Sequence, residues 1–271
     1  MTAAGPRGTY AERPARLDGA FLWTRTAPPA AAPSGAVLPD GCMDLVWADG
    51  HLFVAGPDTR PWVPGERAER YAGFRFAPGD APRVLGVPAR ELRDRRVGLG
   101  DLWGTAAARR FAGRIGAGPD PAAALERLVL RRAADAPPPD PVLRGAVARL
   151  DAGRPVAATA DALGLGARRL HRLSLDAFGY GPRTLARILR LQRALALLRA
   201  GLPPAEAAVR AGCVDQAHLT RETRALAGTT PAAYARSFAL PASSPAEGTA
   251  GAVSRSAKRE TPAPSGSRTT A

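Results

Sequence analysis

Residues 167–187 read ARRLHRLSLDAFGYGPRTLAR, and residues 216–236 read QAHLTRETRALAGTTPAAYAR. The two stretches share a leucine, two arginines, a glycine and a proline at an offset of 49 residues. The shared residues are Leu170, Arg172, Gly179, Pro182 and Arg187 in the first copy, and Leu219, Arg221, Gly228, Pro231 and Arg236 in the second. Self-similarity at a fixed offset indicates two copies of one structural unit.

Each copy follows a short alanine-rich stretch with helical spacing and then a glycine turn, at Gly164 and at Gly212. A helix, a glycine turn and a second helix with an outward arginine are the outline of a helix-turn-helix. Such a unit places its second helix in the major groove of DNA. The repeat therefore predicts two units in tandem, which would contact two neighbouring stretches of DNA.

Positive charge is concentrated in the repeat region. The chain has 271 residues and a formal net charge of +14, and Lys258 is its only lysine. Residues 140–240 contain 15 arginines against seven acidic residues. A basic region of this kind is the electrostatic footprint of a polyanion-binding protein, although an arginine-rich composition alone is a weak indication.

Composition predicts two folded domains and a tail, which suits a chain of this length. The proline run 137–139 cannot continue a helix and makes a stiff spacer. We therefore expect a β-rich domain at 17–136 and a helical domain at 141–238. Residues 1–16 and the basic tail 241–271 have little apolar content and are predicted to be disordered.

The first domain has strand character and then helical character. Apolar runs at 43–47 and 51–54 flank Asp49-Gly50, which is a strong hairpin signal. Further strands are expected at 21–23 and 71–76, giving a small sheet or partial barrel. The expected helices are 81–85, one from a cap at Asp101 to about Ile115, and 121–134 with Asp120 as its cap.

The second domain is predicted to be nearly all helix, so that the fold class of the whole chain is α+β. The expected helices are 141–150, 156–163, 167–178, 184–199, 203 or 204 to 211, one capped by Asp215 to about 226, and 231–238. The helix 184–199 would join the two units. Its ~16 residues span roughly 24 Å, which suits recognition helices about one DNA turn, ~34 Å, apart.

The first recognition helix carries three candidate DNA-binding residues, Arg168, Arg169 and Arg172. Arg168 and Arg172 are four residues apart and therefore share one face, while Leu170 faces the core. An arginine can pair with guanine O6 and N7 through two hydrogen bonds. For any single arginine, an ordinary solvated helix face remains the alternative.

The second recognition helix carries a different set. Its candidate DNA-binding residues are Gln216, Ala217, His218, Thr220 and Arg221. Glutamine can read adenine, and alanine can touch the thymine methyl group. The joining helix adds Arg183, Arg187, Arg190 and Arg193, for which phosphate contacts and solvated charges are equally good interpretations.

Residues 141–238 resemble the DNA-binding domain of the AraC/XylS family of bacterial transcription regulators. Ala-Gly-Cys-Val-Asp-Gln-Ala-His-Leu-Thr-Arg at 211–221 and Ala-Gly-Thr-Thr-Pro-Ala-Ala-Tyr at 227–234 are similar to the family's Gly-Phe turn, Asp-Gln-Ser-His-Phe and Gly-x-Thr-Pro. The chain departs from this pattern at Cys213, Ser174 and Thr223, where aromatics are expected, and at Gly166, where a serine cap is usual. The resemblance implies double-stranded promoter or operator DNA as the partner.

The stretch 38–47 resembles an N-terminal domain that precedes AraC-type domains and whose role is poorly defined, and 56–60, 75–79 and 101–104 fit the same pattern. By this resemblance the domain would sense a small-molecule effector or mediate association. The chain would then be a one-component transcription regulator, a monomer or a homodimer, with RNA polymerase as a further partner.

Other signals exclude several classes. The chain has only two cysteines, Cys42 and Cys213, which make neither a disulfide framework nor a zinc pattern. No apolar run reaches the ~18 residues of a membrane span, and no catalytic grouping or phosphate loop stands out. We expect a cytoplasmic, nucleoid-associated protein that is not an enzyme and needs no cofactor or metal.

Two alternatives stay open in the first domain. Cys42 could be a redox sensor or alkyl-group acceptor coupled to DNA binding, because a thiolate near arginine is reactive, although a buried inert cysteine is the better interpretation. Asp40, Asp44 and Asp58 could bind a cation, although roles in turns and at strand edges fit them better.

Overall fold

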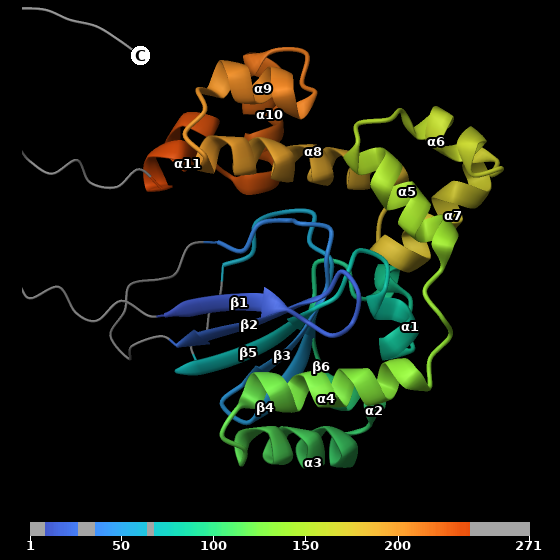
Figure 1. Cartoon of the computed structure of the whole chain (residues 1–271), viewed down its shortest axis with the longest axis vertical. Helices are drawn as coiled ribbons and strands as arrows, with labels where there is room; N and C mark the ends of the chain where they lie inside the picture. Colours follow the sequence, from blue (N-terminus) through green and yellow to red (C-terminus); the bar gives the residue numbers. More distant parts are fainter. Residues whose placement is uncertain (1–8, 27–35, 64–67, 239–271) are drawn as a thin grey trace, which may run out of the picture. The chain divides into compact units, whose positions relative to one another are not determined.

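The structure is a computed structural model that describes residues 9–26, 36–63 and 68–238. It contains an antiparallel sheet with helices against it, followed by a helical region (Figure 1). The strands are β1 (Tyr10–Pro14), β2 (Phe21–Thr26), β3 (Asp44–Ala48), β4 (His51–Ala55), β5 (Arg70–Arg75) and β6 (Arg96–Gly98). The first helices are α1 (Ala81–Leu85), the 3-10 turn η1 (Ala89–Glu91), α2 (Leu99–Trp103), α3 (Thr105–Gly116) and α4 (Pro121–Ala134).

The sheet has the strand order β1-β2-β5-β3-β4-β6, with every neighbouring pair antiparallel. The predicted hairpin is present as β3–β4, in which Ala48 pairs with His51. Its turn residues Asp49 and Gly50 have φ angles of 40° and 89°. Two positive φ angles are typical of the type I′ turn that Asp-Gly favours, because this turn matches the twist of the flanking strands.

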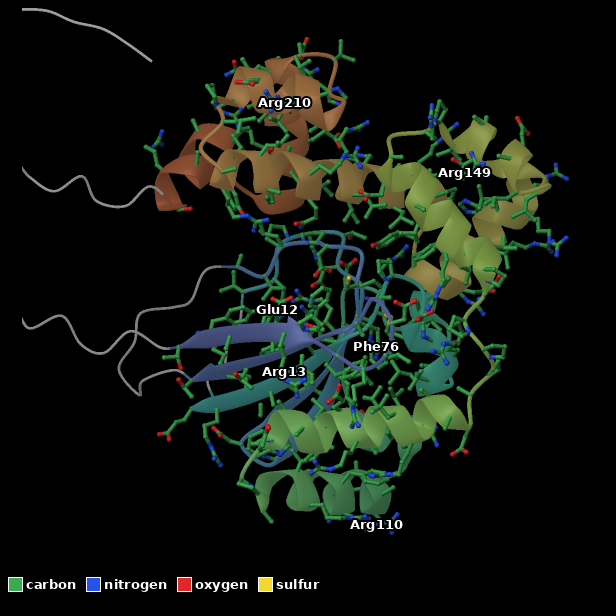
Figure 2. All side chains as sticks on the ribbon, viewed as in Figure 1. Glu12, Arg13, Phe76, Arg110, Arg149 and Arg210 are labelled. Atoms are coloured by element: carbon green, nitrogen blue, oxygen red, sulfur yellow. The ribbon has the colours of Figure 1, made fainter. Side chains whose placement is uncertain are left out.

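The core of this region lies between the sheet and the helices α3 and α4. Trp47, Phe74 and Phe76 are fully buried in it, and Figure 2 shows Phe76 beside the sheet. The Trp47 indole Nε1 donates to the Ala112 carbonyl in α3 at 3.3 Å, which satisfies its one polar atom. Gly73 in β5 leaves room for Trp23, since a Cβ there would lie 1.9 Å from the Trp23 ring.

Two expectations for this region are wrong, and one strand was not predicted. The segment predicted to be disordered before residue 17 contains β1, which pairs with β2 through its backbone even though its side chains are exposed. Asp101 caps no helix but lies inside α2, and Gly104, with a φ of 87°, separates α2 from α3. Strand β6 was not expected, because its three residues are too short for a pattern. The tail 241–271 and residues 1–8 lie outside the described residues.

The helical region agrees closely with the sequence. Its helices are α5 (Pro141–Asp151), α6 (Val156–Ala162), α7 (Ala167–Phe178), α8 (Pro182–Arg199), α9 (Pro204–Ala211), α10 (Gln216–Ala227) and α11 (Pro231–Phe238). Asp120 and Asp215 cap α4 and α10 as predicted, each accepting a backbone N–H from the third residue beyond it. Helix α8 begins two residues earlier than expected, at Pro182, because proline is favoured in a first helical turn.

Apolar side chains of the helical region form two clusters. A large one gathers residues of α8, α9 and α10 around Leu185, Ile188 and Leu219. A smaller one holds Leu170 of α7 against alanines of α5 and α6. Leu170 and Leu219 therefore lie in different clusters, although Ala177 and Phe178 at the end of α7 also join the large one.

Residues up to Phe238 form one compact unit, in which the end of α7 contacts the first region. Arg90 of η1 forms an ion pair with Asp176 of α7. Phe178 lies over Gly79, where an added Cβ would approach its ring to 2.8 Å. Gln192 of α8 donates to the Pro39 carbonyl at 2.5 Å. The sheet region thus contacts both α7 and α8.

Candidate nucleic-acid interface

Helix α7 presents a basic face at its N-terminal end. Gly166 is its N-cap and offers no side-chain oxygen, so the first turn has no side-chain cap. Leu170 is buried one turn further on. Arg168, Arg169 and Arg172 are exposed, and within residues 9–26, 36–63 and 68–238 none of them has an ion-pair partner. Three guanidinium groups therefore remain available for a partner molecule.

The outward side of α7 is slightly hollow. Ala167, Arg168, His171 and Arg172 line an open depression on its surface. His171 lies against the next turn, since a Cβ at Gly181 would come within 2.8 Å of its ring. Arg168 and Arg172 thus share this depression, as their four-residue spacing predicts.

Helix α10 presents a more mixed face. Gln216, Ala217 and Arg221 are exposed. The His218 side chain lies at the N-terminus of α10, where its Nδ1 accepts the Val214 N–H at 3.3 Å. The Thr220 hydroxyl donates to the Gln216 carbonyl within its own helix at 2.9 Å. His218 and Thr220 are therefore partly committed to local hydrogen bonds, whereas the other three side chains project freely.

The two helix-turn-helix units contain the same buried hydrogen bond at equivalent positions. Ser174 and Thr223 are 49 residues apart, both are buried, and each hydroxyl donates to the carbonyl four residues earlier at 2.8 Å. These acceptors belong to Leu170 and Leu219, the buried leucines of the repeat. A hydroxyl that bonds back to its own helix is satisfied in an apolar core. Small hydroxyl residues can therefore stand where the related family has aromatics.

The structure shows what the four arginines of the joining helix α8 contact within the chain. The sequence left open whether these arginines are phosphate contacts or solvated charges. Arg187 Nε donates to both carboxylate oxygens of Glu222 in α10, at 3.2 and 3.0 Å. Arg190 Nη2 lies 3.7 Å from the same carboxylate. Arg193 donates to the Asp151 carboxylate at 3.0 Å and to the Ala211 carbonyl at 3.2 Å. Arg183 is exposed and has no ion pair in the described part of the chain.

Glu222 is the member of this surface that the sequence did not reveal. It lies 35 residues from Arg187, and the contact depends on how α10 crosses α8. Its only local signal is an acidic residue next to Arg221 in a helix with two arginines. Such a signal is equally typical of an ordinary solvated charge.

The three aspartates considered as cation ligands, Asp40, Asp44 and Asp58, are each paired with an arginine. Arg75 Nε lies 3.4 Å from the Asp40 carboxylate and donates to Asp44 at 3.2 Å. Arg96 binds both oxygens of Asp58, at 2.5 and 2.7 Å. Burial raises the pKa of Asp40 and of Asp58, in each case against the effect of the arginine. In the described ranges no group of three or more His, Cys, Asp or Glu residues is placed to hold a metal ion.

Cys42 lies beside this cluster, and its backbone N–H donates to Asp40 at 2.9 Å. Burial and the neighbouring Asp40 carboxylate raise the pKa of the Cys42 thiol well above its usual value. Burial also raises the pKa of the Cys213 thiol. Both cysteines therefore favour the protonated form, which is a poor nucleophile.

Tyr180, between α7 and α8, is buried, and its hydroxyl has no hydrogen-bond partner in the described part of the chain. Burial raises the pKa of Tyr180 well above its ordinary value, and the carboxylate of Asp40 adds to that shift. Tyr180, at the junction between α7 and α8, therefore favours its neutral form. Across the described ranges, no helix is both long and apolar enough to cross a membrane.

Two protein families match the chain. Residues 159–237 match a helix-turn-helix domain, and residues 20–98 match a domain of unknown function, DUF6597. The first match covers α7 and α10 together with the helix that joins them, and the second covers β2 to β6 of the sheet. Comparison with curated proteins gives no match.

Several solved structures are similar to parts of the chain. The C-terminal domain of AraT, a response regulator from Geobacillus stearothermophilus, is 21% identical, with a TM-score of 0.36 over 41% of this chain and 96% of that one. A probable AraC family transcriptional regulator from Rhodopseudomonas palustris CGA009 is 24% identical, with a TM-score of 0.33 over 36% and 98%. ToxT from Vibrio cholerae O395 is 8% identical, with a TM-score of 0.44 over 85% and 98%.

These three TM-scores indicate a distant likeness, so the assignment depends on the two family matches and on the repeated helix pair. The sequence resemblance to the AraC/XylS pattern is thereby confirmed. Residues 159–237 therefore form an AraC-type helix-turn-helix domain, which supports a DNA-binding role, and residues 20–98 match the DUF6597 domain.

Proposed function

We propose that the chain regulates transcription by inserting α7 and α10 into adjacent major grooves of one promoter or operator. The observation that carries this proposal is the pair of exposed helix faces, Arg168 and Arg172 on one helix and Gln216 and Arg221 on the other. The exposed arginines among them lack ion-pair partners in the described residues. Side chains of these kinds read base edges through paired hydrogen bonds.

The length of α8 supports the two-groove arrangement. Its 18 residues extend roughly 27 Å at 1.5 Å per residue. With the turns at its two ends, this distance suits recognition helices about one DNA turn, ~34 Å, apart. Because the two recognition faces differ, the DNA site would be asymmetric, and one monomer would occupy it without a palindrome.

We further propose that the N-terminal region modulates DNA binding, through a small-molecule effector or through association into a homodimer. The contacts Arg90–Asp176 and Gln192–Pro39 support this role, because they tie the sheet region to α7 and to α8. A change at the sheet would thereby bias the angle between the recognition helices. A regulator of this kind would act in the cytoplasm, at the nucleoid, with RNA polymerase as a further partner.

The DNA-reading role is tested by Arg172→Ala and Arg221→Ala. Each variant is expected to weaken binding to the duplex that the full chain selects from a random pool by about 1–3 kcal/mol. The reason is that each change removes one base-edge contact and leaves the other unit in place. Mobility-shift titrations give the affinities, and a second selection with each variant should show relaxed base preference in one half of the site only.

Arg149→Ala serves as the matched control, because Arg149 is an exposed arginine of the same helical region but lies on α5 and not on a recognition helix. Figure 2 shows it at the surface of the helical region. It should keep the full base preference of the parent chain. Unchanged base preference in both Arg172→Ala and Arg221→Ala would contradict the proposed function.

Sensing at Cys42 is the alternative, and the raised pKa of its thiol argues against it. We expect iodoacetamide at neutral pH to label Cys42 in the folded chain at least about tenfold more slowly than in the unfolded chain, since only the thiolate reacts. Mass spectrometry of timed samples measures both rates. Fast labelling of the folded chain, with a change in DNA binding, would instead favour the sensor.

A further inference from the structure

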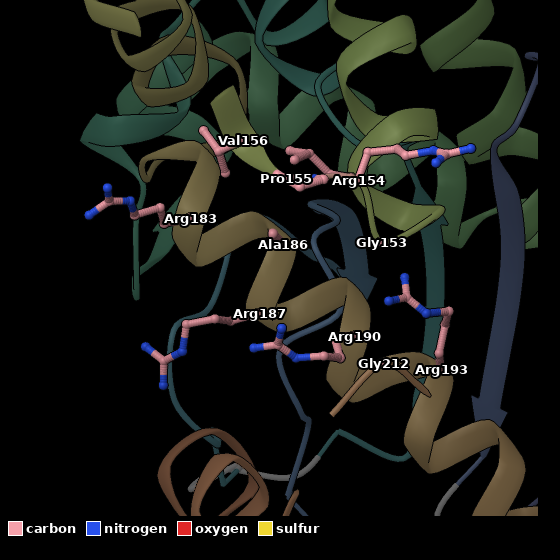
Figure 3. Close-up of a pocket in the computed structure, with 11 residues that line it drawn as sticks. Gly153, Arg154, Pro155, Val156, Arg183, Ala186, Arg187, Arg190, Arg193 and Gly212 are labelled. Atoms are coloured by element: carbon pink, nitrogen blue, oxygen red, sulfur yellow. The ribbon is translucent and has the colours of Figure 1, made fainter. Parts of the chain in front are cut away.

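A groove lined with arginines lies between the two helix-turn-helix units. Figure 3 shows it with Arg183, Arg187, Arg190 and Arg193 on α8 and Arg154 on the turn between α5 and α6. The groove has a volume of about 390 Å³. Its walls come from both units, since Gly153 and Val156 belong to the first and Gly212 to the second.

The four α8 arginines form a single stripe, because their spacings of four, three and three residues place them on one side of the helix. Two carboxylates neutralise part of this positive charge. Glu222 pairs with Arg187 and Arg190, and Asp151 pairs with Arg193. Five guanidinium groups against two carboxylates leave a groove that attracts anions.

The pairing inside the groove is incomplete. The Arg190 Nε is buried and has no hydrogen-bond partner in the described part of the chain. The Arg190 side chain is 25% exposed and the Glu222 side chain 15% exposed. A planar guanidinium offers five donors, so one shared carboxylate cannot satisfy both Arg187 and Arg190. The exposed N–H groups of the two side chains are therefore free to donate to water or to a bound anion.

We propose that this groove binds a backbone phosphate of the DNA between the two major-groove contacts, and that Glu222 occupies part of that position in the free protein. The inference rests on the proposed function, because it places the DNA across α8. Arginine is well suited to phosphate, which it can bind through two parallel hydrogen bonds. Glu222 then acts as an internal competitor, and DNA binding draws Arg187 and Arg190 from the carboxylate to the phosphate.

Glu222→Gln tests the competitor directly. Glutamine keeps the size of the side chain but removes the charge that holds the two arginines. The variant should bind the selected duplex severalfold more tightly at low salt. In the parent chain the Glu222 charge still offsets part of this phosphate contact, so in the variant the slope of log affinity against log salt should become steeper, by up to about 0.9, the value for one full phosphate contact. Mobility-shift titrations between about 50 and 200 mM salt measure both quantities.

Glu206→Gln is the matched control. It makes the same change in net charge and breaks one ion pair, Arg210–Glu206 at 2.6 Å, on α9 and outside the groove. It should leave the slope unchanged. If both variants steepen the slope equally, the effect belongs to overall charge and the proposal is overturned.

Arg183→Gln gives an independent measurement that does not disturb Glu222. Arg183 is exposed, so its loss should leave the melting temperature unchanged. The slope should fall by about 0.9, with equal loss of affinity on selected and scrambled duplexes. Arg149→Gln, outside the groove, should change neither quantity.

A duplex series with one neutral methylphosphonate at each position between the half-sites locates the phosphate. One position should weaken the parent chain and have a smaller effect on Arg183→Gln. Inorganic phosphate at the concentration of the nucleotide phosphates should not displace the duplex, which separates a DNA phosphate from a free anion site. If the parent chain prefers the selected duplex but no position matters, only the groove proposal fails. If it shows no preference at all, the proposed function itself fails.

Discussion

Arg96→Met is expected to lower the free energy of unfolding by about 3–5 kcal/mol, because it leaves the Asp58 carboxylate buried without its partner. Arg96 binds both oxygens of Asp58, and the two side chains are 15% and 9% exposed. Methionine retains an apolar stem against Trp62, whose ring centroid lies 4.2 Å from the guanidinium carbon. Urea denaturation followed by circular dichroism measures the loss.

The pH dependence of this variant has a definite sign. Burial already raises the pKa of Asp58 although Arg96 opposes it, and removal of Arg96 raises that pKa further. The folded variant then binds a proton more tightly than the unfolded chain does. Its stability therefore falls as pH rises from the ordinary aspartate range through the raised pKa. The deficit relative to the parent chain should shrink as pH is lowered.

Two further variants isolate the buried charge. The double variant Arg96→Met with Asp58→Asn should recover most of the loss, because replacing both partners removes the unpaired charge. Arg210→Met breaks an exposed pair with Glu206 and should change stability by no more than about 0.5 kcal/mol. A double variant as unstable as Arg96→Met alone would show that packing, and not charge, explains the loss.

The sequence predicts the elements whose signals are local. The Asp49-Gly50 turn, the Asp120 and Asp215 caps and the prolines at helix starts each mark an element by residues that lie next to it. Helix α7 ends at Phe178 as predicted, because Gly179 adopts a left-handed conformation with a φ of 78°. Left-handed backbone favours glycine since other residues clash there.

Elements that depend on distant partners could not be predicted. Strand β1 has exposed side chains and is held by backbone pairing to β2, so its sequence carries no apolar period. Glu126 is buried because it accepts the Arg16 N–H at 2.7 Å and lies 3.6 Å from the Arg13 guanidinium. Glu222, which contacts Arg187 and Arg190 of the groove, belongs to the same class. In each case the partner becomes known only when the elements are packed.

The sequence predicts which side chains share the exposed face of a recognition helix. It does not predict which arginines of the helical region form ion pairs. Helical spacing alone places Arg168 and Arg172 on one face, and the exposure of both agrees with that placement. The same spacing cannot show that Arg187 and Arg190 share a carboxylate of α10. The sequence therefore indicates which groups are available to DNA, and the fold adds which of them are already occupied.

Leu170→Ala and Leu219→Ala are each expected to lower the free energy of unfolding by about 2–5 kcal/mol. Both leucines are fully buried, at 1% and 0% exposure. They hold equivalent positions in the repeat but lie in different clusters, Leu170 among alanines and Leu219 in the large cluster of α8, α9 and α10. Urea denaturation gives the two losses, and the half-buried Leu173 provides a control with a smaller one.

The location of each loss should differ even if the sizes agree. Because Leu170 lies in the smaller cluster, Leu170→Ala should reduce hydrogen-exchange protection mainly over α6 and α7 and relax base preference mainly in the half-site of the first unit. Leu219→Ala should do the same for α9 and α10 and the other half-site. Equal loss of protection in both units for either variant would show one cooperative core. Two independently stable cores would instead allow one recognition helix to bind before the other. The DNA site would then be occupied in two steps, because α8 keeps the second unit close to its half-site.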